Sequence, residues 1–368
     1  MPPLEEFEVY LKEIWDSKWL TNNGQFHRKL EEELAKYLNV EFISLFSNGT
    51  LALMSALQAL NITGEVITTP FSFVATTHAL WWNNIKPVFV DIEPETLNID
   101  PAKIEAAITP RTTAILPVHV YGNPCMVDEI QRIADIYGLK ILYDACHTFN
   151  TKLNGIPILN YGDLSVMSFH ATKVFSTIEG GAIISRDEAM KKRIDLLKNF
   201  GFAGETTVIA HGINAKMNEL QSAFGLLQLK YAGTYVEKRK KIYEHYCNLL
   251  KGVPGITVIK TNSNTENCYS YFAVLIDQKK FGIERDEVYN SLKERNIFTR
   301  RYFYPLISQF PAYSGLESAA PGRMPVAERV SSQVLCLPIY PDLQEAEVTN
   351  IVTLIKNMRP QTIVSMTS

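Results

Sequence analysis

Cysteine is scarce in this chain and is not arranged for structural chemistry. The five cysteines are scattered, odd in number, and contain no CxxC pair. This spacing argues against a disulfide framework and against a zinc site, so we expect no metal and a reducing compartment. The cysteines are Cys125, Cys146, Cys247, Cys268 and Cys336.

An excess of charge of one sign is missing as well. The 36 Lys and Arg residues nearly balance the 39 Asp and Glu residues, which gives a net charge of -3 and a pI near 6.2. We therefore expect neither a nucleic-acid partner nor an anionic membrane surface. No apolar run approaches the roughly 18 residues of a membrane span, and residues 1–6 show no secretory signal. These absences together predict a cytoplasmic protein.

The two common glycine-rich phosphate motifs, GxxxxGK[ST] and GxGxxG, are absent too, which argues against a nucleotide cofactor. Instead, Asn48, Gly49 and Thr50 lie between a predicted buried strand and a predicted helix. A glycine there lets the backbone approach a ligand, and the N–H groups at the start of the helix bind a phosphate. We predict a site for one phosphate; an ordinary Asn-Gly turn is the alternative.

The chain has 368 residues, 46% of them hydrophobic, enough for one large domain and a smaller one. Its first 200 residues alternate short apolar strands with helices, which predicts parallel βα units with helices on both faces of a sheet. Ligands of such sheets bind beyond the carboxyl ends of the strands. We expect strands at 42–46, 65–69, 87–91, 112–120, 139–143, 164–169 and 181–185, and helices at 7–19, 27–38, 50–60, 74–83, 101–108, 126–137 and 187–199.

The pattern changes after a long helix that runs from the 220s to about residue 250, with Gly233 as a candidate break. We predict an α/β fold, with a large, mostly parallel sheet domain over 1–240 and a smaller α+β domain over 241–368. The N-terminal helix is available to pack on the smaller domain. In the second domain we expect a strand at 269–276, a helix at 285–295, a strand at 297–302, a loop at 305–325, a helix at 344–358 and a frayed tail from 359.

Two side chains follow predicted strands in positions that suit a planar, charged ligand. Asp144 closes the apolar strand 139–143, where a carboxylate is costly to bury without a cationic partner. A protonated ring nitrogen is such a partner, and a helix cap is the alternative role. Phe73 follows the strand 65–69 and either lies flat on a ring or belongs to the core.

Lys173 follows the strand 164–169 in a short loop before the strand 181–185. A lysine held in a crevice, desolvated and near another cation, loses its proton and becomes a nucleophile toward an aldehyde. For a lone lysine, a solvated loop position is the alternative. The flanking residues, Ser168-Phe169-His170-Ala171-Thr172 and Glu179-Gly180-Gly181, favour the functional interpretation.

These flanks resemble the S-F-x-x-T-K segment of the DegT/DnrJ/StrS nucleotide-sugar aminotransferases, and the similarity runs from residues 19–24 to residues 337–343. It implies an aspartate-aminotransferase-like homodimer of fold type I. Such proteins carry pyridoxal phosphate on the lysine and transaminate keto sugars on nucleotide diphosphates, usually with glutamate as the amino donor. The resemblance implies cofactor contacts from Phe73 to the ring face, Asp144 to the ring nitrogen, His147 near the phenolic oxygen and Ser168 to the phosphate.

The resemblance also assigns residues outside these motifs. Asn214 matches an asparagine that reaches the phosphate of the neighbouring subunit, and Lys216 stands where relatives usually carry arginine. A lysine there offers a point charge instead of a bidentate contact. A cationic and aromatic stretch before Pro305 suits a diphosphate, with a solvated strand edge as the alternative. The expected substrate-binding residues are Thr21, Lys216, Arg301, Tyr302 and Tyr304.

Within the family, the segment 170–181, HATKVFSTIEGG, is most similar to the branch that forms dTDP-4-amino-4,6-dideoxyglucose. This sugar is of a type found in lipopolysaccharide O-antigens. A 3-keto-sugar aminotransferase and a non-catalytic, cofactor-binding regulatory protein are the alternatives. The intact set of Lys173, Asp144 and His147 favours the enzyme, because a regulatory sensor needs no carboxylate at the ring nitrogen.

Overall fold

The chain folds around a seven-stranded sheet, as a computed structural model that describes residues 1–360 shows. In spatial order the strands are β1 (Phe42–Phe46), β9 (Gly181–Ser185), β8 (Leu164–Ser168), β5 (Lys140–Asp144), β4 (Thr112–Leu116), β2 (Glu65–Thr68) and β3 (Lys86–Phe89). The strands from β8 to β3 are parallel, whereas β9 is antiparallel to both of its neighbours. The prediction of a large, mostly parallel sheet is confirmed.

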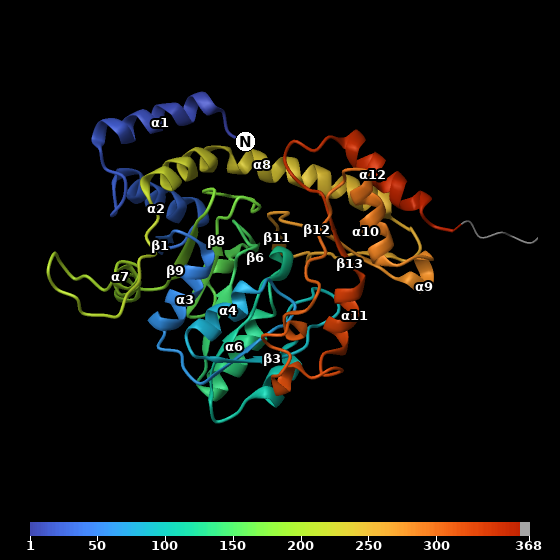
Figure 1. Cartoon of the computed structure of the whole chain (residues 1–368), viewed down its shortest axis with the longest axis horizontal. Helices are drawn as coiled ribbons and strands as arrows, with labels where there is room; N and C mark the ends of the chain where they lie inside the picture. Colours follow the sequence, from blue (N-terminus) through green and yellow to red (C-terminus); the bar gives the residue numbers. More distant parts are fainter. Residues whose placement is uncertain (361–368) are drawn as a thin grey trace, which may run out of the picture.

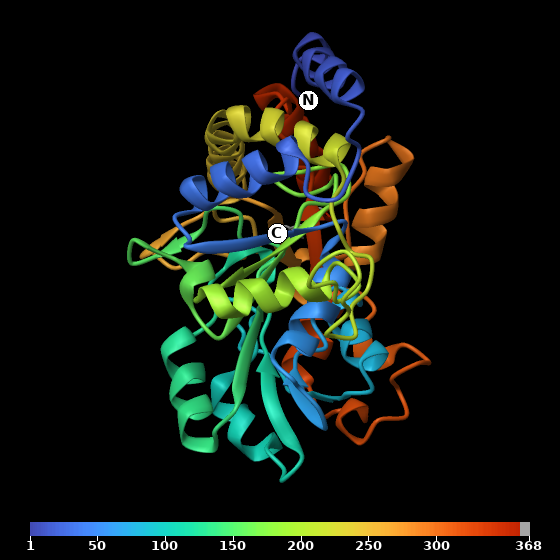
Figure 2. The ribbon, with the colours of Figure 1, turned by 90° about the vertical axis from the view of Figure 1, so that its left-hand side faces the viewer.

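Strand side chains alternate between two apolar layers, as expected for a sheet covered on both faces. In β5, Ile141 and Tyr143 belong to one layer and Leu142 to the other. Figure 2 shows α2 on one side of β1 and α7 on the other. The helices over the layer of Leu142 are α3 (Gly49–Ala59), α4 (Ala75–Trp82) and α7 (Glu188–Leu197); those over the other are α2 (Gln25–Leu38), α5 (Pro101–Ile104), α6 (Val127–Tyr137) and the first half of α8 (Glu219–Leu250).

Helix α8 connects the two ends of the molecule (Figure 1). It begins in a capping box, in which Asn218 and Gln221 each bond the other's backbone N–H. It continues through Gly233 without the break that the sequence suggested. Helix α1 (Leu4–Ser17) packs on its first half, where the rings of Phe7 and Phe224 meet edge to face at 5.5 Å.

The second half of α8 joins a smaller unit with its own apolar core. Its sheet is antiparallel, with β12 (Phe272–Ile276) between β10 (Ile256–Val258) and β13 (Val334–Leu337). Its helices are α9 (Gln278–Phe281), α10 (Arg285–Glu294), α11 (Pro325–Gln333) and α12 (Glu345–Asn357). A minor sheet of β11 (Thr265–Glu266), β6 (Lys152–Leu153) and β7 (Ile156–Pro157) ties this unit to the large one. Short 3-10 helices lie at Glu105–Ala107, Val120–Gly122, Ile158–Asn160, Ile307–Gln309 and Glu317–Ala319.

The structure corrects several predicted elements. The predicted strand 297–302 is wrong: Arg300 alone forms an isolated bridge, to Cys336, and β13 supplies the third strand instead. The strand predicted at 112–120 ends at Leu116, before Pro117, which has no N–H to donate. The strand predicted at 269–276 begins only at Phe272, because Tyr269 has a left-handed φ of 53°.

Helix α11 was not predicted, and it begins at Pro325, the last residue of the predicted loop 305–325. It starts with a proline at its first position, where the missing N–H costs nothing. The predicted frayed tail beyond residue 360 lies outside the described residues. Within the described part, no helix is both long and apolar enough to cross a membrane.

The predicted domain boundary after residue 240 falls inside α8. We propose the division into 1–240 and 241–368 because the smaller unit has an apolar cluster of its own, whereas a further apolar cluster and helix α8 are shared by both units.

Candidate active site

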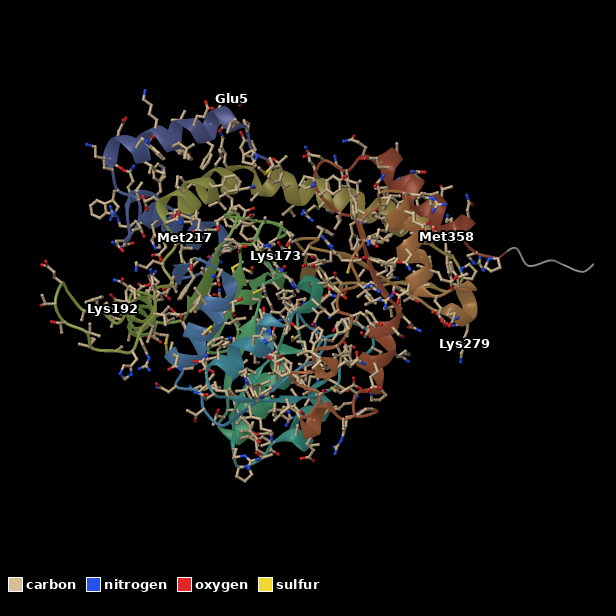
Figure 3. All side chains as sticks on the ribbon, viewed as in Figure 1. Glu5, Lys173, Lys192, Met217, Lys279 and Met358 are labelled. Carbon is tan, nitrogen blue, oxygen red and sulfur yellow. The ribbon has the colours of Figure 1, made fainter. Side chains whose placement is uncertain are left out.

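A cavity of about 660 Å³ lies at the carboxyl ends of the central strands. Figure 3 labels Lys173 there, near the centre of the molecule. The walls come from the start of α3, the start of α4, the ends of β5 and β8, and the smaller unit. The lining residues used below are Asn48, Gly49, Thr50, Ser72, Phe73, Thr76, Asp144, Cys146, His147, Ser168, Lys173, Tyr271, Tyr302 and Phe303.

Lys173 reaches the cavity from the turn after β8, where its backbone N–H donates to the carbonyl of His170 at 2.9 Å. Its amine lies 3.4 Å from the hydroxyl of Tyr271. Burial lowers the pKa of this amine, but Tyr271, Cys146 and Asp144 outweigh it, and the net pKa is above its ordinary value. The expectation of a neighbouring cation that lowers this pKa is therefore wrong for the cofactor-free protein.

Asp144 ends β5 with its carboxylate in the cavity wall, and only 5% of the residue is exposed. Its Oδ2 accepts a hydrogen bond from Thr76 Oγ1 at 2.8 Å, and its Oδ1 accepts one from the N–H of Cys146 at 3.2 Å. Within residues 1–360 it has no ion-pair partner, and no helix starts behind it, so the helix-cap alternative is wrong. A buried carboxylate without a cation favours a cationic ligand group in the cavity.

His147 lies three residues beyond, also buried. Its ring stacks on Phe303, with centroids 6.0 Å apart, and meets the ring of Tyr271 edge to face at 5.0 Å. Burial, helped by Lys173 and His119, holds the pKa of the imidazole well below its ordinary value, so the ring is neutral at neutral pH. Its Nδ1 is buried and has no hydrogen-bond partner among the described residues.

The start of α3 forms the opposite end of the cavity. Asn48 caps the helix, its side chain accepting the N–H of Leu51 at 2.9 Å. The N–H groups of Gly49 and Thr50 donate to no other group in the described part of the chain. Ser168 closes this end, and a Cβ on Gly49 would come within 3.0 Å of the Cβ of Ser168. Free N–H groups at a helix start, beside a hydroxyl, form an anion site.

Phe73 is 56% exposed although it lies in the cavity wall, so it is not a core residue. Its ring offers an apolar surface in the cavity wall.

The structure does not bring every expected residue into this cavity. Of the expected substrate-binding residues, Tyr302 lines it. Arg301 instead donates to Asp286 at 3.0 Å, and its guanidinium also lies 5.2 Å from the ring centre of Tyr304. Outside the cavity of their own chain lie Thr21, Asn214, Lys216, Arg301 and Tyr304.

Several residues that were not predicted also line the cavity, among them Ser72, Thr76, Tyr271 and Phe303. Thr76 stands in the motif that contains Phe73, so its place after β2 was a usable signal. Tyr271 lies 98 residues from Lys173, and no local pattern marks that contact.

These observations fit the pyridoxal phosphate that the sequence resemblance implies. The free N–H groups of α3 and Ser168 suit its phosphate, and the exposed ring of Phe73 suits its planar face. The uncompensated Asp144 suits a protonated ring nitrogen, and the unpartnered Nδ1 of His147 lies on the same wall.

The comparisons with known proteins agree with this site. The sequence matches the DegT/DnrJ/EryC1/StrS aminotransferase family over residues 4–356, and the chain belongs to this family. A relative from Escherichia coli, 55% identical over 96% of each chain, is named dTDP-4-amino-4,6-dideoxy-D-glucose transaminase. A relative from Shigella dysenteriae with the same name is 50% identical, covering 98% of this chain and 97% of its own.

A solved structure of DesI in the presence of its TDP-sugar product superposes on this chain with a TM-score of 0.93. It is 35% identical and covers 97% of this chain and 90% of DesI. The predictions of the family and of its aminotransferase fold are confirmed.

Proposed function

We propose that this enzyme transfers an amino group to a dTDP-linked 4-keto-6-deoxyglucose, with pyridoxal phosphate as its cofactor and glutamate as the amino donor. The proposal rests on one observation: the same cavity is lined by Lys173, Asp144, His147 and the start of α3. The names of the two relatives at 50–55% identity support the dTDP sugar and the 4-amino product.

In this proposal, different residues of the cavity hold different parts of the cofactor. The N–H groups of Gly49 and Thr50 and the hydroxyl of Ser168 hold the phosphate, which a helix start favours through its dipole. Phe73 covers one face of the ring. Asp144, held by Thr76 and by the N–H of Cys146, keeps the ring nitrogen protonated. The neutral His147, whose Nδ1 has no hydrogen-bond partner among the described residues, would be available to the phenolic oxygen.

When bound, pyridoxal phosphate supplies the electron sink for carbon–hydrogen bond cleavage and carries the amino group between the two substrates. Lys173 would hold the cofactor through its amine, and the same Nζ would carry the proton when that amine is free. As a neutral amine it removes a proton from the donor carbon; as an ammonium it returns a proton to the sugar carbon. The surrounding wall of Tyr271, Tyr302 and Phe303 limits the access of water to this amine.

The working unit in this proposal is a cytoplasmic homodimer with shared sites. Asn214 lies outside its own cavity, in the loop after α7 that projects at the left edge of Figure 1. Its Oδ1 accepts Lys216 Nζ at 2.7 Å, which leaves the amide N–H free to reach a partner's phosphate. The same loop exposes Phe200, Phe202 and Ile213, an apolar surface that a second copy of the chain would cover.

The test is a product analysis. Purified protein with cofactor, dTDP-4-keto-6-deoxyglucose and glutamate should yield a nucleotide sugar whose NMR spectrum places the amine at C4. An amine at C3 on the 3-keto isomer would instead assign the 3-amino branch. A change of the cofactor absorbance on adding glutamate separates an enzyme from a regulatory binding protein. If alanine or glutamine, but not glutamate, produces that change, the assignment of the amino donor is wrong.

A further inference from the structure

The amine of Lys173 has one hydrogen-bond partner within residues 1–360, the hydroxyl of Tyr271. The two heavy atoms are 3.4 Å apart, and the amine lies 5.8 Å from the centre of the tyrosine ring, so it sits near the edge that carries the hydroxyl. This contact joins the turn after β8 of the large sheet to the segment just before β12 of the smaller one.

The segment that carries Tyr271 is anchored to the turn after β5. Ser270 Oγ donates to the carbonyl of His147 at 2.7 Å, and Cys268 Sγ donates to the same oxygen at 3.2 Å. Behind it, the buried Arg239 of α8 donates to the carbonyl of Tyr269 at 3.4 Å. The hydroxyl of Tyr271 is thus fixed relative to the strand end that carries Asp144, and it does not depend on a mobile loop.

The hydroxyl is also kept in one chemical form. Burial raises the pKa of the Tyr271 phenol above its ordinary value, and the neighbouring Lys173 only partly offsets this. At neutral pH the group is therefore a neutral phenol. The titratable groups that face the amine of Lys173 are Tyr271, Cys146, Asp144 and His147, with His170 and Glu179 elsewhere in the cavity lining.

We propose that Tyr271 is a further catalytic residue, whose hydroxyl holds the reacting amine of Lys173 and stabilises its protonated form. An N–H of the amine donates to the phenolic oxygen in both protonation states, so the lone pair of the neutral amine is directed away from Tyr271, toward the cavity. Tyr271 keeps its own proton throughout. In the first half-reaction Nζ would take a proton from the donor carbon and pass it to the cofactor; in the second it would take a proton from the cofactor and give it to the sugar carbon. Lys173 therefore ends each half-reaction in the protonation state in which it began.

This inference rests on the proposed function for its kinetic part only. A hydrogen bond to a charged group contributes about 1.5–3 kcal/mol, which corresponds to a factor of roughly 10 to 150. In Tyr271→Phe, kcat should fall by a factor in that range while KM for the nucleotide sugar changes little. Because the lost hydrogen bond stabilised the ammonium, the acid limb of the kcat profile should move to lower pH.

The second measurement uses the cofactor-free protein. Lysines are labelled by reductive methylation with ¹³C-formaldehyde, and the Lys173 signal is identified by its absence in Lys173→Ala. In Tyr271→Phe this signal should titrate at a lower pH than in the wild type. The matched control is Tyr269→Phe, which removes a hydroxyl from the same segment while its ring packs on Tyr243 of α8. It should change neither the titration nor kcat.

An unchanged Lys173 titration in Tyr271→Phe, with circular dichroism showing an intact fold, would overturn the proposal even if kcat fell, because packing alone would then explain the loss. A shifted titration with unchanged kcat would overturn the catalytic role. If the wild type does not aminate dTDP-4-keto-6-deoxyglucose, the proposed function fails, and the amine titration still decides whether Tyr271 holds Lys173.

Discussion

At the scale of single residues, the cavity combines charges that do not balance one another. Asp144 is buried without a cation, His147 is neutral, and the pKa of Lys173 is raised. Burying the Asp144 carboxylate without an ion pair is unfavourable, and a ligand that brings a protonated nitrogen would compensate for it. The cavity is therefore suited to a cofactor that brings a positive charge to the Asp144 carboxylate.

Lys173→Ala should abolish turnover in a folded protein, since both the covalent anchor and the proton carrier are removed. General acid–base groups alone account for about 10²–10⁴-fold in rate. Borohydride reduction followed by intact-mass measurement should find the cofactor attached to the wild type and not to the variant. Lys192→Ala is the control, because Lys192 is exposed on α7, far from Lys173 in Figure 3. Substantial activity in Lys173→Ala would contradict the assignment.

Asp144→Asn preserves the shape of the side chain and removes its charge. The ring nitrogen then loses the partner that keeps it protonated, so kcat should fall by roughly a hundredfold or more, as for other lost electrostatic contacts in active sites. Affinity for the cofactor, measured by fluorescence titration, should fall much less, because the phosphate contacts remain. Comparable losses of rate and affinity would instead indicate that Asp144 only supports the structure.

At the scale of elements, the antiparallel strand β9 shapes the phosphate end. It enters the sheet between β1 and β8, and its first residue, Gly181, touches the turn that carries Asn48 and Gly49. A Cβ at position 181 would lie 2.8 Å from three backbone atoms of that turn. The glycine is therefore required by the close approach of two backbones.

Gly181→Ala should displace the turn and weaken cofactor binding by about tenfold to a hundredfold, the contribution of one hydrogen bond to a charged phosphate. Equilibrium dialysis of the cofactor measures this. The control is Gly233→Ala in the middle of α8, where a Cβ meets only the hydroxyl of Tyr37, at 3.9 Å. That change should stabilise the protein by about 0.5–1 kcal/mol through helix propensity and leave binding unchanged. Equal cofactor affinities in the two variants would refute the role of β9.

A second element-scale feature is the buried ion network beneath the loop after α7. Burial alone would raise the pKa of the Glu31 carboxyl, but Lys198, His27 and Lys191 outweigh it and hold the pKa far below its ordinary value. Glu31 Oε1 also accepts the N–H of Leu45 at 3.0 Å, so the network links α2, β1 and α7. Its stabilisation is present above the ordinary glutamate pKa and is lost as pH falls below it.

Glu31→Gln should destabilise the protein at pH 7 by roughly 1.5–3 kcal/mol, the contribution of a hydrogen bond to a charged group, because Lys191 and Lys198 then keep only Asp195 as a carboxylate partner. The wild type should lose stability as pH falls below about 4.3, whereas the variant should lose less over the same range. Thermal unfolding midpoints at pH 7 and below pH 4 test both statements. A parallel pH dependence in the two proteins would show that Glu31 does not contribute to it.

At the scale of the whole molecule, α8 holds the two units around the cavity, while the loop that carries Asn214 and Lys216 lies outside it. Its backbone meets the turn before α3, where the N–H of Ser47 donates to the carbonyl of Ala215 at 2.8 Å, but Asn214 and Lys216 do not line the cavity of their own chain. In the proposed homodimer this loop would lie at the partner's phosphate, and cofactor binding would then strengthen the dimer by mass action.

Mixing two inactive variants tests this arrangement. One carries Lys173→Ala, and the other combines Asn214→Ala with Lys216→Ala. Random exchange makes half of the dimers mixed, and each mixed dimer has one site with an intact lysine and an intact partner loop. Activity should return to about a quarter of the wild-type value. If native mass spectrometry verifies exchange and no activity returns, the sites are not shared.

The sequence by itself determined the local features of the site. The apolar strand that ends at Asp144, the Asn-Gly turn at the start of α3 and the lysine after β8 depend on side-chain periodicity and capping over a few residues. Such patterns can be recognised in a sequence because the residues that produce them are neighbours in the chain. The resemblance of the residues around Lys173 supplied the family, and the comparisons bear it out.

Only the tertiary structure determined which of these residues contact residues from distant parts of the chain. Thr76 and Asp144 are 68 residues apart in the chain, and Lys173 and Tyr271 are 98 residues apart. Both contacts follow from the order of the strands and the path of α8. The third strand of the smaller sheet was misplaced because the segment 297–302 has a strand-like composition, while the pairing partner of β12 is chosen by packing. A side chain's partner across a sheet is set by which backbones hydrogen-bond side by side, and no local pattern encodes that choice.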